Sequence, residues 1–173
     1  AGETTATTSF NPKDDTLYDA ASNETAIISI TNVAGGNALE SGDQSVTLTI
    51  TDNESAPTVT LGTSASSVAE NGSDLTLTAT LSVASFADVI VTLTGSGTST
   101  SGTDYASLST ITISAGSTSG TTAFNPTGDS VYEGSETAII AITNVTGGGA
   151  TESGTQFETI TITDADSAPT VTL

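Results

Sequence analysis

The sequence predicts an all-β protein built from tandem antiparallel β-sandwiches, of which the first unit is incomplete. Three observations lead to this prediction. Apolar and polar residues alternate along most of the chain, which is typical of half-buried strands. Glycine-rich and Asn-Gly turns separate these segments, and no segment keeps the spacing of an amphipathic helix. The chain also repeats itself, since Ala56–Leu61 and Ala168–Leu173 both read APTVTL, 112 residues apart.

The repeat continues upstream of these two copies. Thr25–Val33 (TAIISITNV) corresponds to Thr137–Val145 (TAIIAITNV) at the same shift of 112. The tripeptides Phe-Asn-Pro that begin at Phe10 and Phe124 correspond at a shift of 114. Because the shift falls from 114 to 112 along the chain, the first copy has two extra residues between Asp19 and Glu24. A period close to the commonest domain size indicates an array of like modules.

The repeat divides the chain into three parts. We expect residues 1–55 to be the C-terminal half of one repeat, 56–167 a complete repeat, and 168–173 the first strand of a following repeat. Three strands cannot close two sheets. We therefore expect the missing strands of the first repeat to lie upstream in a longer protein, rather than to be supplied by another chain.

Seven strands are expected in the complete repeat, a number that fits an immunoglobulin-like sandwich of this length. The clearest is 74–81, where Leu75, Leu77, Ala79 and Leu81 share one face. In chain order the seven cover 56–61 (continuing raggedly to Val68), 74–81, 87–94, 108–114, 118–124, 137–145 and 156–163. Turns at Asn71-Gly72, Gly95-Ser96-Gly97, Ala115-Gly116-Ser117 and Gly147-Gly148-Gly149 separate them. The first repeat has only the last three strands, over 4–10, 25–33 and 44–51.

Composition limits the function. Twenty acidic residues face one base, Lys13, for a net charge of −19. The natural partners of such a chain are cations, and we expect neither nucleic acid nor anionic membranes to bind it. The chain has no Cys and no His, which removes thiolate chemistry, imidazole bases and the usual zinc ligands. We therefore do not expect an enzyme. No apolar run is long enough to insert into a membrane.

Most of the acids are predicted to meet at one end of each sandwich. If every strand reverses direction, the loops after the first, third and fifth strands and the end of the seventh strand share one end. That end collects Glu70, Asp104, Asp129, Glu133, Glu136, Asp164 and Asp166, with Asp74 nearby. The same layout in the first repeat collects Asp15, Asp19, Glu24, Asp52 and Glu54. Asp88 and Glu152 map to the opposite end, where we expect solvated acids.

So many carboxylates without Lys or Arg repel one another. Unit charges about 4 Å apart interact at about 4 kcal/mol with an effective dielectric near 20. A divalent cation relieves this repulsion, and Ca²⁺ fits best, because it accepts six to eight oxygens in flexible geometry whereas Mg²⁺ requires a stricter octahedron. The alternative is that these are solvated loop acids of an acidic protein.

Four short segments of the complete repeat resemble motifs of the Calx-β family of calcium-binding modules. This family is found in sodium–calcium exchangers, integrin β4 and large microbial surface proteins. The four segments are Ser67-Val68-Ala69-Glu70-Asn71-Gly72, Gly102-Thr103-Asp104-Tyr105, Tyr132-Glu133-Gly134-Ser135-Glu136-Thr137 and Ile162-Thr163-Asp164-Ala165-Asp166. The resemblance implies an immunoglobulin-like sandwich and calcium ligation by the seven acids of the complete repeat. The sequence also departs from the family pattern. The family has consecutive acids at the end of the last strand, and Ala165 interrupts this run in the complete repeat as Asn53 does in the first repeat. The longer segment from Asp19 to Glu24 predicts fewer or weaker ions in the first repeat.

The junction between the repeats is short. From Asp52 to Pro57 there is almost no linker, and Pro57 restricts the backbone at the crossing. We expect each repeat to contact its neighbour head-to-tail, with ions at Asp52 and Glu54 stiffening the joint.

The sequence therefore predicts a calcium-binding, calcium-stiffened structural repeat of a long extracellular adhesin or surface filament, with self-association into filaments as a possible property. One alternative is a calcium-sensing regulatory domain of a membrane transporter, which would require micromolar affinity and nearby membrane helices. Another is a carbohydrate- or protein-binding tip, although few aromatic residues are available for stacking on sugars.

Overall fold

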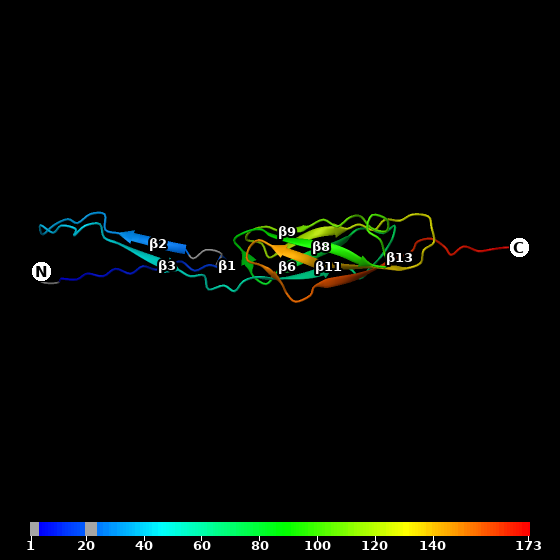
Figure 1. Cartoon of the computed structure of the whole chain (residues 1–173), viewed down its shortest axis with the longest axis horizontal. Helices are drawn as coiled ribbons and strands as arrows, with labels where there is room; N and C mark the ends of the chain where they lie inside the picture. Colours follow the sequence, from blue (N-terminus) through cyan, green and yellow to red (C-terminus); the bar gives the residue numbers. More distant parts are fainter. Residues whose placement is uncertain (1–3, 20–23) are drawn as a thin grey trace.

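A computed structural model describes residues 4–19 and 24–173, and all its regular elements in these ranges are strands. Figure 1 shows an elongated molecule, in which a hairpin near the N-terminus precedes a compact sandwich and the C-terminal segment leaves the opposite end. The all-β sandwich that the sequence predicts is confirmed.

The sandwich has two sheets. One contains β10 (Ser119–Phe124), β6 (Leu75–Leu81), β4 (Thr58–Thr63) and β12 (Thr151–Glu152), in that order. The other contains β5 (Ser67–Ala69), β13 (Phe157–Thr163), β11 (Glu136–Thr146), β8 (Val89–Gly97) and β9 (Ile111–Ile113). The main strands pair antiparallel. As a result, the successive long strands reverse direction as the sequence predicts.

The core lies between the inner faces of the two sheets. On β6 the residues Leu75, Leu77, Ala79 and Leu81 are all buried and alternate with outward-facing residues, as the period-2 pattern predicts. Tyr105 and Phe124 close one end of the core, and their stacked rings have centroids 5.0 Å apart. Because Tyr105 directly follows Asp104, this stacking also anchors the loop that carries Asp104.

The N-terminal hairpin repeats part of the sandwich. Its strands are β2 (Glu24–Ser29) and β3 (Ser45–Ile50). Glu24 pairs with Ile50 and Ser29 with Ser45, and the same pairs recur 112 residues later between β11 and β13. The two segments therefore fold into the same hairpin in the same register.

The two hairpins differ in what covers them. In the sandwich Ile140 is fully buried, whereas its counterpart Ile28 in β2 is 40% exposed. Ile27, Ile30 and Val46 of the N-terminal hairpin are also exposed. The hairpin keeps its strand pairing, but no second sheet from the described residues covers its apolar side chains.

Two expected strands are absent, so the prediction of strands over 4–10 and 168–173 is wrong for this chain. The counterparts of these segments in the sandwich are β10 and β4, and both bond to β6. Neither residues 4–10 nor residues 168–173 have an equivalent of β6 beside them. Because a strand needs a partner for its backbone N–H and C=O groups, both segments remain irregular.

Three short strands were not anticipated. They are β1 (Leu17–Tyr18), β7 (Ala84–Ser85) and β12. β1 pairs with β7, β12 with β4, and β5 with β13, and all three pairs are parallel. These pairs add parallel edges to an otherwise antiparallel sandwich, and β1–β7 joins the N-terminal segment to it.

We expect Phe124→Ala to lower the free energy of unfolding by about 3–5 kcal/mol, because it removes a fully buried ring and leaves a cavity beside Tyr105. Denaturant unfolding followed by circular dichroism measures this. The matched control is Phe157→Ala, whose ring is 58% exposed and whose loss should change stability by less than about 0.5 kcal/mol. Equal effects of the two variants would contradict the core assignment.

Candidate metal centre

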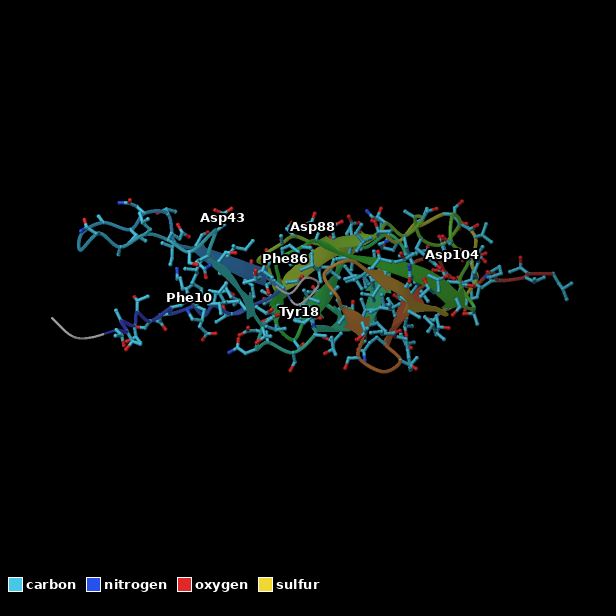
Figure 2. All side chains as sticks on the ribbon, turned by 60° about the vertical axis from the view of Figure 1, so that its left-hand side comes forward. Phe10, Tyr18, Asp43, Phe86, Asp88 and Asp104 are labelled. Atoms are coloured by element: carbon cyan, nitrogen blue, oxygen red, sulfur yellow. The ribbon has the colours of Figure 1, made fainter. Side chains whose placement is uncertain are left out.

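The strand reversals bring six of the seven predicted acids of the complete repeat into two groups. Glu70, Asp164 and Asp166 form the first group, and Asp104, Glu133 and Glu136 form the second. In each group three carboxylate oxygens, one from each residue, lie within 4.8 Å of one another. In Figure 2 Asp104 lies at the end of the sandwich away from Tyr18 and Phe86.

The first group lies where β5 runs beside the end of β13. The backbone N–H of Glu70 donates to the Thr163 carbonyl at 3.0 Å. The N–H of Ala165 lies 3.3 Å from Glu70 Oε1 and donates to it. Glu70 is only 7% exposed. The loop that follows β5 therefore places a buried carboxylate beside the end of β13.

Asp164 connects the two groups. Its Oδ2 accepts hydrogen bonds from the N–H groups of Glu133 (2.7 Å) and Gly134 (2.6 Å). Its Oδ1 accepts from the N–H of Asp166 at 2.7 Å. These backbone donors, that of Gly134 first, lower the pKa of Asp164, so it remains ionised while it holds the loop of the second group in place.

Asp166 carries the observation that points most directly to a cation. Its Oδ2 is buried and has no hydrogen-bond partner among the described residues. A buried carboxylate oxygen without a partner is costly, and such groups in native proteins usually have a donor or a bound ion. The residues around it are oxygen donors of the kind that Ca²⁺ prefers, so the donor set fits a hard divalent cation.

Desolvation and mutual repulsion act together in the second group, in which Glu133 is exposed and Glu136 half-buried. Asp104 is fixed by the N–H of Thr100, which donates to its Oδ2 at 2.6 Å. Burial raises the pKa of Glu133, and the charges of Asp129, Asp104 and other nearby acids add to this effect. Burial likewise raises the pKa of Glu136, followed by the charge of Asp104. Without a cation, these glutamates are harder to ionise than usual.

Asp129 is the one predicted acid of the complete repeat outside both groups. Its Oδ1 accepts a hydrogen bond from the N–H of Val131 at 2.7 Å. It therefore shapes the loop, and it acts on Glu133 through its charge.

The five acids predicted in the first repeat also come together. One pocket is lined by Asp15, Asp19, Glu24, Asp52 and Glu54, together with Asp14 and Lys13. Asp52 accepts from the N–H of Asp19 at 2.8 Å and from that of Glu54 at 3.0 Å. A side-chain hydrogen bond with Asp52 is the main cause of the raised pKa of Glu54. Residues 20–23, which make this loop longer, lie outside the described residues.

Sequence reasoning did not place Lys13 at this site. It is the one base of the chain, and Thr127 stands at its position in the second repeat. The correspondence of Phe10-Asn11-Pro12 with Phe124-Asn125-Pro126 carries the signal that could have found it. Thr100 and its hydrogen bond to Asp104 were also missed, and no sequence signal marks them.

The remaining acids near the strand ends have structural partners. Asp74 Oδ2 accepts from the Asn125 amide at 2.7 Å and belongs to neither group. At the other end Asp88 Oδ1 accepts from the N–H of Ala115 at 2.8 Å. Glu152 Oε1 accepts from the N–H of Gln156.

The pKa shifts predict a pH dependence of stability in chelator. Glu133 and Glu136 have folded pKa values above the ordinary 4.5, so the stability they contribute is full below that value and is lost as the pH rises through the folded pKa. Asp164 acts oppositely, since its contribution is present above 3.8 and is lost as the pH falls through its lowered pKa. We expect the melting temperature in chelator to rise as the pH falls through the raised pKa values of Glu133 and Glu136 toward 4.5.

Glu136→Gln should reduce the rise of the melting temperature with falling pH, because the glutamine amide cannot ionise. Asp43→Asn, which removes an exposed charge from the N-terminal hairpin loop, controls for the loss of one negative charge. Differential scanning calorimetry of the three proteins checks the effect. Equal slopes against pH for Glu136→Gln and the parent chain would contradict it.

The solved structures that resemble this chain share its fold at low sequence identity. The apo-form Calx CBD1 domain aligns with 63% of this chain and 99% of its own, at 18% identity and a TM-score of 0.53. CBD12 from CALX1.2 (19% identity) and the calcium binding domain CBD12 of CALX1.1 (20%) each align with 57% of this chain at a TM-score of 0.50. The chain spans 41% and 40% of those two proteins. No curated protein matches it by sequence.

The family comparison refines the expected resemblance. The Calx-β-like fold is confirmed by these structures, but the family model that matches is a different one. It is the LapA domain, over residues 56–173. The family and the structural neighbours are binding or structural domains rather than enzymes. Since the match covers more than half of the sequence, the chain belongs to the LapA domain family.

Proposed function

We propose that this chain is a calcium-binding, calcium-stiffened structural repeat of a long extracellular adhesin or surface filament. The observation that carries the proposal is the Oδ2 of Asp166, which is buried beside Glu70 and Asp164 and has no hydrogen-bond partner in the part of the chain that the structure describes. The second carboxylate group lies next to the first and is linked to it through Asp164.

The residues that would hold ions are the acids at this end. Glu70, Asp164 and Asp166 would hold one ion, and Asp104, Glu133 and Glu136 another, with Asp129 contributing charge. A bound cation would supply positive charge that the chain itself lacks there. The carboxylates come from four separate parts of the chain, so binding would tie the loops of both sheets together.

The joint between the repeats is the second proposed site. Asp15, Asp19, Glu24, Asp52 and Glu54 line it, and the short segment from Asp52 to Pro57 leads directly into β4. Lys13 lines the same pocket and would offset part of the negative charge. We therefore propose weaker binding here than at the end of the complete sandwich, with stiffening of the crossing as its effect.

Membership of the LapA domain family supports a place at the cell surface, in an adhesin. Extracellular calcium modules need dissociation constants of only about 10⁻⁴–10⁻³ M. The competing function, a calcium-sensing domain of a membrane transporter, is favoured by the fold shared with the Calx domains. Within the described residues, no helix is long and apolar enough to cross a membrane.

Isothermal calorimetry with Ca²⁺ tests the binding. At 10 mM free Ca²⁺, a site with a dissociation constant of about 10⁻⁴–10⁻³ M would stabilise the fold by about 1.4–2.7 kcal/mol. We expect Asp166→Asn to remove most of this stabilisation, because it removes the charge of the unpartnered carboxylate. Asp43→Asn should retain it.

The results separate the candidate functions. A dissociation constant of about 10⁻⁴–10⁻³ M supports the surface repeat, and a micromolar dissociation constant favours the sensor. Identical melting temperatures of the parent chain in Ca²⁺ and in chelator would contradict both.

Stiffening has its own measurement. Small-angle scattering of the whole chain should give a narrower distribution of shapes and a larger maximum dimension in Ca²⁺ than in chelator, because ions at Asp52 and Glu54 restrain the crossing. Asp52→Asn should weaken the response more than Asp43→Asn does. An unchanged maximum dimension would contradict the proposed stiffening while leaving calcium binding in place.

A further inference from the structure

We propose that Val131 and Tyr132 form a docking site for a following copy of this same repeat, and that the contact is made by strand pairing and an aromatic ring rather than by a metal ion. The occupant would be the copy's segment corresponding to Ala84–Phe86, together with its glycine turn. The proposal rests on a contact that the chain already makes once, and it does not depend on calcium.

The existing contact joins the N-terminal segment to the near end of the sandwich, the end away from Asp104. Leu17 pairs with Ala84 and Tyr18 with Ser85 in the parallel β1–β7 ladder. The N–H of Phe86 donates to the Tyr18 carbonyl at 3.1 Å. Figure 2 shows Tyr18 and Phe86 together at this end.

The sandwich surface around Ser85 and Gly149 accommodates the Tyr18 ring. A Cβ at Gly149 would lie 2.5 Å from Tyr18 Cε1, so the ring occupies the space that a side chain there would need. Ser85 is buried, donates from its hydroxyl to the Gly148 carbonyl at 3.2 Å, and accepts from the N–H of Gly116 at 2.8 Å. These bonds connect three turns of the sandwich into one preformed surface.

Leu17 and Tyr18, the docking element of the existing contact, have a counterpart later in the chain. Val131-Tyr132 occupies the position of Leu17-Tyr18, 114 residues later. Asp129 accepts from the N–H of Val131 as Asp15 does from that of Leu17. Asp164 accepts from Glu133 and Asp166 as Asp52 does from Asp19 and Glu54, with bonds of 2.7–3.0 Å. The loop is therefore held in the same way in both copies.

The docking element is covered in one copy and open in the other. Leu17 and Tyr18 are half-buried against the sandwich. Val131 is 57% exposed and Tyr132 49% exposed, and neither belongs to a strand. An aliphatic side chain and an aromatic ring are thus exposed on a loop that has the same hydrogen bonds as the loop at the other junction.

The sequence after this element identifies the occupant. Ala168–Leu173 is identical to Ala56–Leu61, and Pro169 follows Asp164 at the same distance as Pro57 follows Asp52. A chain that continued with the same sequence would bring its own Ala84–Phe86 to Val131 and Tyr132. The contact would fix the rotation of each repeat on its neighbour along the array.

Cysteine pairs test this contact directly, because the chain contains no cysteine of its own. The protein to use is the full chain followed after Leu173 by a second copy of residues 62–167. It carries Val131→Cys together with Ala84→Cys in the appended copy. Paired strand residues lie within the range of Cα separations that a disulfide spans. Mild oxidation should close an intramolecular disulfide in chelator, at least about tenfold faster than a mismatched pair, because docking raises the effective concentration.

Two control pairs calibrate the result. Leu17→Cys with Ala84→Cys in the original chain reports on the contact that the structure shows, and Val131→Cys with Phe157→Cys in the appended copy is the mismatched pair. Gly149→Asn in the appended copy should slow closure of the Val131 pair, since its Cβ meets the tyrosine ring. The turn tolerates this residue, because Asn37 has φ 54° at the equivalent position of the first repeat.

Closure of the Val131 pair as fast as the Leu17 pair, slowed by Gly149→Asn, supports the proposal. Closure no faster than the mismatched pair would overturn it, as would failure of the Leu17 pair itself. Disulfides between separate molecules would also overturn it, since the occupant would then be another chain. Closure that required Ca²⁺ would show a metal-dependent joint, which contradicts this proposal but agrees with the proposed function.

Discussion

Backbone hydrogen bonding between strands is the constraint on which the rest of this structure depends. A strand persists here only where a neighbour supplies partners for its N–H and C=O groups. β10 and β4 both rely on β6, and the equivalent segments 4–10 and 168–173, which have no such neighbour, form no strand. The N-terminal hairpin survives because β2 and β3 satisfy each other. The short β1–β7 ladder applies the same rule across the junction.

The two ends of the sandwich have complementary chemistry. One end gathers carboxylates from loops that the strand reversals bring together, and backbone N–H groups orient several of them. The other end is made of turns in which glycine leaves room for a tyrosine from the preceding segment. The loop that carries Asp15 and Asp19 also carries Leu17 and Tyr18. Acidic site and docking element are therefore parts of one loop, and ordering either one would help to order the other.

Much of the site was predictable from local features of the sequence. Alternation at Leu75, Leu77, Ala79 and Leu81 marked a buried face correctly, because period-2 spacing is a property of the strand itself. Strand reversal then sent Glu70, Asp104 and Asp164 to the same end. Asp129 lies outside both carboxylate groups, and its side chain instead accepts a hydrogen bond from the N–H of Val131.

The sequence by itself determined which segments can be strands, where the chain repeats, and at which end the acids gather. Each of these follows from short-range spacing and from the reversal of successive strands. Only the tertiary structure decided which carboxylates share a group, that Asp166 Oδ2 is buried with no partner among residues 4–19 and 24–173, and that Tyr18 lies against Gly149. These depend on how closely segments far apart in the chain approach one another, and that distance is set by packing of the whole sandwich, which no local pattern records.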